Sequence, residues 1–138
     1  MTRERDIHFV ASHVGEAQKT MAELQKRYGQ AELETAGVIV ALGGDGFMLR
    51  TLHRFLPAGL PVYGMKIGDV GFLMNRFRED ELLERLNEAD VVELNPLCMI
   101  AVTEAGNEAT ALAINEVALL RQLNQAAHIR ILVNGKQK

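Results

Sequence analysis

The chain has 138 residues and a formal net charge of −3 at pH 7, and 48% of its residues are hydrophobic and 24% charged. This composition is that of an ordinary globular chain and excludes collagen-like and intrinsically disordered proteins. With 5% aromatic residues and no tryptophan, the slightly acidic chain also lacks the basic face and stacking platform that nucleic-acid binders use. We therefore expect one globular domain, or part of one, without a nucleic-acid partner.

The chain contains one cysteine, Cys98, which lies in an apolar stretch. We expect it to be buried, because a lone cysteine forms no disulfide within the chain and its surroundings lack zinc-binding spacing. The apolar run over 7–12 is too short for a signal peptide, and no stretch approaches the roughly 20 apolar residues of a membrane span. The sequence therefore predicts a cytoplasmic protein without a membrane partner, and it indicates no metal-ligating residues.

Short apolar runs alternate with amphipathic segments in the first half of the chain. We expect, in order, a strand over 7–12, a helix over 16–28, a strand over 38–42, a helix from 47 to 56 and a strand over 61–65. Gly29 is placed as a helix C-cap, and Pro57 stops the second helix. Continuous apolar strands that alternate with amphipathic helices predict a parallel sheet with helices on both faces.

The second half changes from this pattern to short strands joined by turns. A short helix is expected over 79–88, followed by strands over 97–103, 109–120 and 128–133. Asn134-Gly135 then predicts a hairpin, because both positions of a type I′ turn need a positive φ. Only 136–138 follow as a returning strand. We therefore expect either that the chain is part of a longer one or that another segment supplies the partner.

A glycine-rich turn, Gly43-Gly44-Asp45-Gly46, separates the second expected strand from the second helix. Open α/β sheets bind ligands at such carboxyl ends of strands, and paired glycines let phosphates approach the backbone closely. Asp45 would repel a phosphate, so its carboxylate suits a substrate hydroxyl, whose proton it would accept, or a metal ion on the phosphates. A tight turn with Asp45 as an ordinary helix N-cap is the alternative interpretation.

Two further segments are candidates for binding. Residues 64–73 place three glycines after the third strand, and we expect this loop to lie beside the first one. The alternative is a structural connection in which Phe72 and Leu73 fill the core. Asn115-Glu116 place an amide and a carboxylate in an apolar stretch, where they would read a base and hold ribose hydroxyls, or face solvent on an edge strand.

These three motifs, in this order and at these intervals, resemble those of bacterial NAD kinases. The resemblance covers essentially the whole chain and rests on 43–50, on 68–73 and on Asn115-Glu116. The GGDG turn by itself is shared with phosphofructokinases and with diacylglycerol and sphingosine kinases. The implied reaction transfers a phosphoryl group from ATP or inorganic polyphosphate to the adenosine ribose 2′-hydroxyl of NAD, which gives NADP, with a divalent metal that is usually magnesium.

The resemblance also assigns roles to residues. It makes Asp45 the residue that contacts the adenosine ribose and acts as the base for its 2′-hydroxyl. Nucleotide binding falls to the turn and to positions further along the chain, namely Gly43, Gly44, Asp45, Gly46, Arg50, Phe72, Leu73, Asn115 and Glu116. Members of the family are commonly homodimers or tetramers, so a homo-oligomer is expected for the full-length protein.

The same resemblance implies a Rossmann-like α/β domain over 1–95 and, over 96–138, the opening antiparallel strands of a truncated, β-rich second domain. Family members are longer, and their second domain supplies more of the NAD site, so we expect this chain alone to catalyse little. Lys66-Ile67 depart from the family, which usually has asparagine in this stretch. Two alternatives stay open: another GGDG-type kinase acting on a lipid or a sugar, and a non-catalytic nucleotide-binding module.

Overall fold

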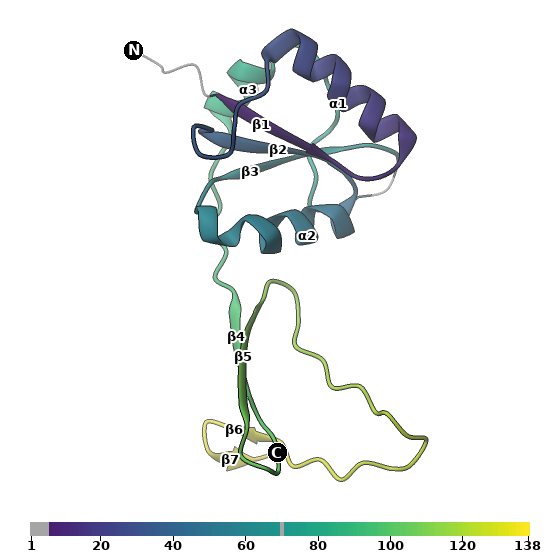
Figure 1. Ribbon diagram of the computed structural model, residues 1–138, viewed down its shortest axis with the longest axis vertical. Coiled ribbons are helices and arrows are strands. Elements are labelled where there is room, and N and C mark those ends of the chain that lie inside the picture. The colour runs from purple at the N-terminus through teal and green to yellow at the C-terminus, as the bar shows by residue number, and fades with distance from the viewer. Residues whose placement is uncertain (1–5, 70) are drawn as a thin grey trace.

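The computed structural model describes residues 6–69 and 71–138, which form a parallel α/β unit followed by two hairpins (Figure 1). The α/β unit contains β1 (Ile7–Ala11), α1 (Gly15–Tyr28), β2 (Val38–Gly43), α2 (Asp45–Phe55), a 3-10 turn (Leu56–Ala58), β3 (Val62–Lys66) and α3 (Leu82–Glu88). The hairpins pair β4 (Leu97–Val102) with β5 (Glu108–Ala113) and β6 (Leu132–Val133) with β7 (Lys136–Gln137). No helix in these described ranges has the length and apolar character needed to cross a membrane.

The α/β unit is built on a three-stranded parallel sheet with β2 in the centre. Every residue of β2 is buried, as its unbroken apolar sequence predicts. Helix α1 lies on one face of the sheet and α2 on the other (Figure 1). Leu24 of α1 packs in one core cluster with Val40 of β2 and with Leu82 and Leu86 of α3. The predicted parallel sheet with helices on both faces is therefore confirmed.

Helix α3 begins at Leu82 rather than at the predicted position 79, because its N-cap Glu81 has a positive φ of 56°, which a right-handed helix does not allow. Tyr28 Oη donates a hydrogen bond of 2.7 Å to the backbone carbonyl of Glu79. Arg27 Nη1 lies 2.7 Å from Asp80 Oδ1 in an exposed ion pair. These two contacts of 79–80 also tie the segment before α3 to the end of α1.

The first hairpin corrects the predicted strand over 109–120. Strand β5 ends at Ala113, where its partner β4 begins with Leu97, so all six residues of β5 are paired. The described part of the chain has no strand beside 114–120 that would continue the ladder. Residues 114–120 are therefore mostly apolar but do not form a strand. The predicted antiparallel pairing itself is confirmed.

The second hairpin is shorter than the predicted strand over 128–133. Only Leu132–Val133 form a strand, because β7 offers two residues as partners. The predicted turn between the strands is confirmed, since Asn134 and Gly135 have φ values of 52° and 75°. Both values lie in the left-handed region that a type I′ turn requires.

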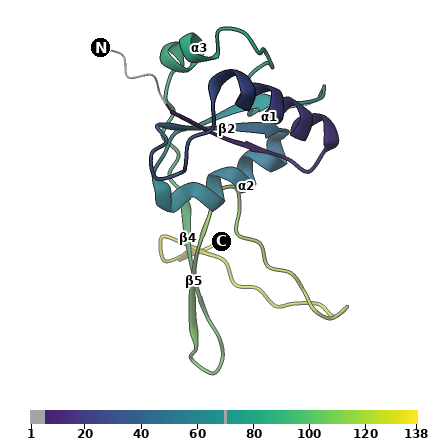
Figure 2. The ribbon, with the colours of Figure 1, turned by 45° about the horizontal axis from the view of Figure 1, so that its top comes forward.

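The β4–β5 hairpin extends from the α2 side of the α/β unit, and 114–131 follow it as a long irregular connection (Figure 1, Figure 2). Large apolar side chains in this part face solvent, and Leu120 is 95% exposed. Cys98 is also exposed, so its predicted burial is wrong. The physical reason is that the α/β unit has helices over both faces of its sheet, whereas β4 and β5 are exposed along almost their whole length.

Candidate functional site

The glycine-rich turn joins β2 to α2 at the carboxyl edge of the parallel sheet. Gly43 is the last residue of β2, Gly44 is the N-cap of α2, and the helix begins with Asp45. A Cβ atom on Gly43 would lie 2.9 Å from Phe47 Cβ, so only glycine lets the helix approach the strand this closely. Because Asp45 lies inside the helix, the alternative in which it is the N-cap is wrong.

The Asp45 side chain reaches across to the second glycine loop and accepts hydrogen bonds from its backbone. Phe72 N donates to Asp45 Oδ1 at 3.0 Å and to Oδ2 at 2.8 Å, and Leu73 N donates to Oδ1 at 2.9 Å. The two loops therefore lie beside each other, as expected from the order of parallel strands.

These contacts determine the charge of the carboxyl group. The backbone N–H groups of Phe72 and Leu73 lower the pKa of Asp45 below its ordinary value, and the positive charge of Lys66 adds to this effect. Partial burial acts in the opposite direction but is outweighed. Asp45 is therefore an anion at neutral pH.

Gly71 allows this close approach, and Lys66 borders it. A Cβ atom on Gly71 would lie 3.2 Å from Asp45 Oδ1 and 3.2 Å from Lys66 Cδ, so a larger residue there would press on both side chains. Lys66 Nζ donates to the backbone carbonyl of Asp69 at 3.0 Å. Lys66 stands opposite Gly43 in the β2–β3 register, which brings its side chain to the same edge of the sheet as the glycine-rich turn.

The side chains of Phe72 and Leu73 point away from the protein although their backbone is held. Phe72 is 94% exposed and Leu73 is 52% exposed. The alternative interpretation, in which both residues fill the core, is therefore wrong. A ligand can stack on an exposed aromatic ring if the backbone that carries the ring is held in place. Phe72 has both properties.

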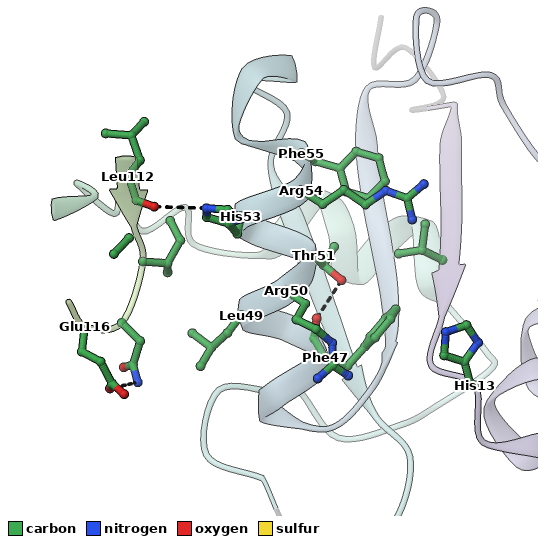
Figure 3. A pocket seen from close by; sticks show the side chains of 14 residues that line it. His13, Phe47, Leu49, Arg50, Thr51, His53, Arg54, Phe55, Leu112 and Glu116 are labelled. Carbon is green, nitrogen blue, oxygen red and sulfur yellow. Dashed lines mark hydrogen bonds between the residues drawn. The ribbon is translucent and has the colours of Figure 1, made fainter. Parts of the chain in front are cut away.

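A cavity of about 690 Å³ lies between α2 and the chain at the end of β5 (Figure 3). Its lining includes Phe47, Arg50, His53 and Arg54 of α2 and Asn115 and Glu116 beyond β5. His53 Nε2 donates a hydrogen bond of 3.1 Å to the backbone carbonyl of Leu112, which joins the helix to the hairpin. Both arginines bring positive charge to the cavity, and that charge suits an anionic ligand.

Asn115 lies in a bend after β5 and Glu116 follows it in irregular chain, so neither residue lies within a strand. Asn115 Nδ2 donates to Glu116 Oε2 at 2.7 Å, and both residues are exposed. The amide thus orients the carboxylate, while the Asn115 carbonyl oxygen and Glu116 Oε1 can accept hydrogen bonds from a ligand. The predicted position inside an apolar strand is wrong, but the pair does line a cavity.

The predicted site residues fall into two groups in the structure. Asp45 gathers with Phe72 and Leu73 at the sheet edge, whereas Arg50 lines the cavity with the amide–carboxylate pair. Gly46 lies between the groups, since a Cβ atom there would stand 4.0 Å from Arg50 Nη1.

Most of the cavity-lining residues were not among the predicted site residues, and His53 and Arg54 of α2 are two of them. The only available signal was that they follow Arg50 by three and four residues, a spacing that puts them on one side of a helix.

Comparison with known proteins identifies the family. The family model described as the ATP-NAD kinase N-terminal domain matches residues 4–92. An NAD kinase of Xylella fastidiosa (strain 9a5c) is 54% identical over 138 residues, which are 100% of this chain and 53% of that protein. An NAD kinase of Cereibacter sphaeroides (strain ATCC 17025 / ATH 2.4.3) is 56% identical over 136 residues, 99% of this chain and 53% of the relative.

A third relative, the NAD kinase of Xanthomonas campestris pv. campestris (strain 8004), is 51% identical over 140 residues that cover 100% of this chain and 54% of the relative. The chain thus spans about half the length of the curated relatives that it matches. The family model alone covers more than half of this chain. On this basis, the chain belongs to the ATP-NAD kinase family and contains its N-terminal domain.

Proposed function

We propose that this chain forms the N-terminal part of an enzyme that transfers a phosphoryl group from ATP or polyphosphate to the adenosine ribose 2′-hydroxyl of NAD and so makes NADP. The observation that carries the proposal is the Asp45 carboxylate, which is ionised and held at the carboxyl edge of the sheet between two glycine loops. The names of the relatives, all NAD kinases, supply the substrate.

In the proposed step, the 2′-hydroxyl oxygen bonds to the terminal phosphorus of the donor. The bond from that phosphorus to its leaving oxygen breaks, and the hydroxyl proton passes to the Asp45 carboxylate. The lowered pKa makes Asp45 a weak base. Its main contribution is therefore to hold and orient the hydroxyl, because positioning and charge stabilisation do most of the work in phosphoryl transfer.

The dinucleotide is proposed to lie along α2, from the glycine-rich turn to the cavity. Arg50 would bind a phosphate of NAD, because a guanidinium pairs with phosphate oxygens through two parallel hydrogen bonds. Asn115 would read a base and Glu116 would accept ribose hydroxyls, a role that the exposure and acceptor atoms of both residues support. Phe72 and Leu73 would cover the apolar part of the ligand.

Magnesium is the divalent metal that we propose for the reaction. No group of three His, Cys, Asp or Glu side chains gathers as a possible metal cage within 6–69 and 71–138. Mg²⁺ is commonly held by one or two carboxylates together with substrate phosphates, so the donor would bring most of its ligands. Bound there, the ion would neutralise charge on the transferred group.

We also propose that 1–95 and 96–138 belong to two domains, the second of them completed by further chain. The relatives' additional length and the exposed apolar residues after position 90 support this division.

The same exposed surface supports a homo-oligomer, either a dimer or a tetramer, because uncovered apolar area favours association. A cytoplasmic location fits the free thiol of Cys98.

The deciding experiment measures NADP formation by the full chain as its gene encodes it, with NAD, magnesium and either ATP or polyphosphate. We expect turnover that Asp45→Asn lowers by about 10²-fold, the lower end of what a positioned proton acceptor contributes, because the amide neither accepts the proton nor holds the hydroxyl as the anion does. Asp90→Asn, which changes an exposed aspartate after α3, is the matched control and should leave the rate unchanged.

Other outcomes would reject this function. Phosphorylation of a lipid or a sugar in place of NAD would assign the chain to another kinase of the GGDG type. Tight NAD binding without any turnover would identify a non-catalytic nucleotide-binding module.

A further inference from the structure

The contact between Asp45 and the Gly71–Leu73 turn points to a second task for this side chain. We propose that both carboxylate oxygens of Asp45 anchor the Gly71–Leu73 turn and thereby fix the position of Phe72 in the nucleotide site, while the remaining lone pair of Oδ2 is left for the substrate hydroxyl. The anchoring stands on the geometry of this chain alone. Its consequence for NAD binding rests on the function proposed above.

The hydrogen bonds leave part of the carboxylate free. Phe72 N lies closer to Oδ2, at 2.8 Å, than to Oδ1, at 3.0 Å, and Leu73 N donates to Oδ1 at 2.9 Å, so both oxygens hold the turn. A carboxylate offers about four lone-pair sites in total. Oδ2 accepts one hydrogen bond from the turn and therefore retains a lone pair for a ligand hydroxyl while both oxygens hold the turn.

Few other bonds hold this segment. The chain is fixed before the turn by Ile67 N, which donates to the Gly43 carbonyl at 2.9 Å. It is fixed after the turn at Asn75, whose N–H donates to the Gly64 carbonyl at 2.8 Å. Between these two points, the hydrogen bonds of the described residues are those to Asp45 and the one from Lys66 Nζ to the Asp69 carbonyl. Asp45 is thus the main anchor of the turn.

The anchor matters because the Phe72 ring is 94% exposed. An aromatic side chain left open to water gains from being covered, and a flat nucleobase covers it well by stacking. Holding the backbone in advance reduces the entropy lost when a ligand binds. The anchored turn is therefore a prepared platform, and its loss should weaken NAD binding as well as turnover.

Three substitutions separate anchoring from proton acceptance. Asp45→Asn keeps one oxygen that can accept from Leu73 N but places an amide donor where Oδ2 accepts from Phe72 N at 2.8 Å, so it weakens the anchor in part and removes proton acceptance. Asp45→Ala removes both functions. Gly71→Ala keeps the carboxylate but places a Cβ atom 3.2 Å from Asp45 Oδ1, so the carboxylate or the turn must shift by a few tenths of an ångström and the anchoring hydrogen bonds weaken.

Gly15→Ala is the control for replacing a glycine, since Gly15 stands at the start of α1 with nothing within 4 Å of an added Cβ. The experiment uses the full chain as its gene encodes it. Hydrogen exchange of the Phe72 and Leu73 amides is followed by NMR, the NAD dissociation constant by calorimetry without donor, and kcat with donor present.

We expect both amides to exchange roughly tenfold faster or more in Asp45→Ala, the Phe72 amide to exchange faster than the Leu73 amide in Asp45→Asn, a smaller acceleration in Gly71→Ala, and the wild-type rate in Gly15→Ala. The NAD dissociation constant should rise most in Asp45→Ala, and kcat in Asp45→Asn should fall by more than its NAD dissociation constant rises, because its turn stays partly anchored.

The proposal is overturned if Asp45→Ala leaves amide exchange unchanged, or if Gly71→Ala frees the amides without weakening NAD binding. A wild-type chain that makes no NADP would reject the proposed function alone, because amide exchange reports the anchor without any turnover.

Discussion

The α/β unit and the two hairpins are both rich in apolar residues, yet they bury them to very different extents. In the α/β unit, Ile39, Val40 and Leu42 of the central strand have no exposed surface. In the hairpin part, Leu119 and Leu120 are largely exposed, and β4 and β5 face solvent along almost their whole length. An apolar run becomes core only where a second layer of structure covers it.

The candidate site depends on both regions. The α/β unit supplies Asp45 with its anchored turn and Arg50, whereas the chain after the first hairpin supplies Asn115 and Glu116. His53 joins the regions through its hydrogen bond to Leu112. The part of the cavity lined by Asn115 and Glu116 therefore comes from the hairpin region, which buries fewer of its apolar residues than the α/β unit does.

The difference in burial between the two regions should have its largest effect on the free energy of unfolding. We expect Leu42→Ala, which empties a fully buried position, to lower the free energy of unfolding by about 2–5 kcal/mol. Leu120→Ala should change it by less than about 0.5 kcal/mol in these 138 residues, because the side chain is already solvated. Urea unfolding followed by circular dichroism measures both.

Equal effects from the two leucines would contradict the contrast. If Leu120→Ala lowered the free energy of unfolding only in a longer chain, the contrast would hold. That result would show that the additional residues cover the hairpin region.

Sequence patterns predicted the α/β unit well because its signals are local. The unbroken apolar run at 38–42 could only be a strand buried on both faces, and the strand extends just one residue further. The apolar residues of 114–120 carry a similar signal, yet they form no strand, because pairing depends on a partner that the local sequence does not contain. The late start of α3 follows from the left-handed backbone of Glu81, which the local apolar pattern does not signal.

The site was predictable to the extent that topology determines it. Parallel strand order predicts that the loops after β2 and β3 lie together, and the contact between Asp45 and Phe72 confirms this. Whether Asp45 would bond to its own helix or to the neighbouring loop could not be predicted, because both choices satisfy the same carboxylate. The place of His53 depends on how the hairpin packs against α2, which no local pattern encodes.

The next effect concerns the two sides of the cavity. Arg50→Met removes a cation from the α/β side, and Glu116→Gln removes an anion from the other side. We expect each to raise the NAD dissociation constant by about tenfold, the size of one charge-assisted hydrogen bond. Arg130→Met, an exposed arginine in the irregular connection, is the control. If only Arg50→Met weakens binding, the hairpin region contributes nothing to the ligand site.

A smaller effect is expected at the junction between the regions. His53→Ala removes the hydrogen bond to the Leu112 carbonyl and leaves Asn115 and Glu116 less well placed. The NAD dissociation constant should rise by about threefold, because one neutral hydrogen bond is lost and no ligand contact is removed directly. His128→Ala, an exposed histidine outside the cavity, should have no effect. A loss equal to that of Glu116→Gln would mean that His53 itself contacts the ligand.

The smallest expected effect is a lowered pH at which the Asp45 carboxylate takes up a proton and its hydrogen bonds to the turn are lost. The hydrogen bonds from Phe72 and Leu73 lower the pKa of Asp45 below the ordinary value of 3.8, so the anchor is complete above that pH and is lost only as the pH falls through the lowered pKa. The amide proton shifts of Phe72 and Leu73, followed by NMR in acid, should therefore move with a midpoint below 3.8, and this movement should be absent in Asp45→Asn. A midpoint at or above 3.8 would mean that the turn does not hold the ionised carboxylate, and the contact would then be no stronger than solvation by water. Because the buried β2 core contains no ionisable side chain, its own packing should persist through the same pH range, which separates release of the anchor from unfolding of the α/β unit.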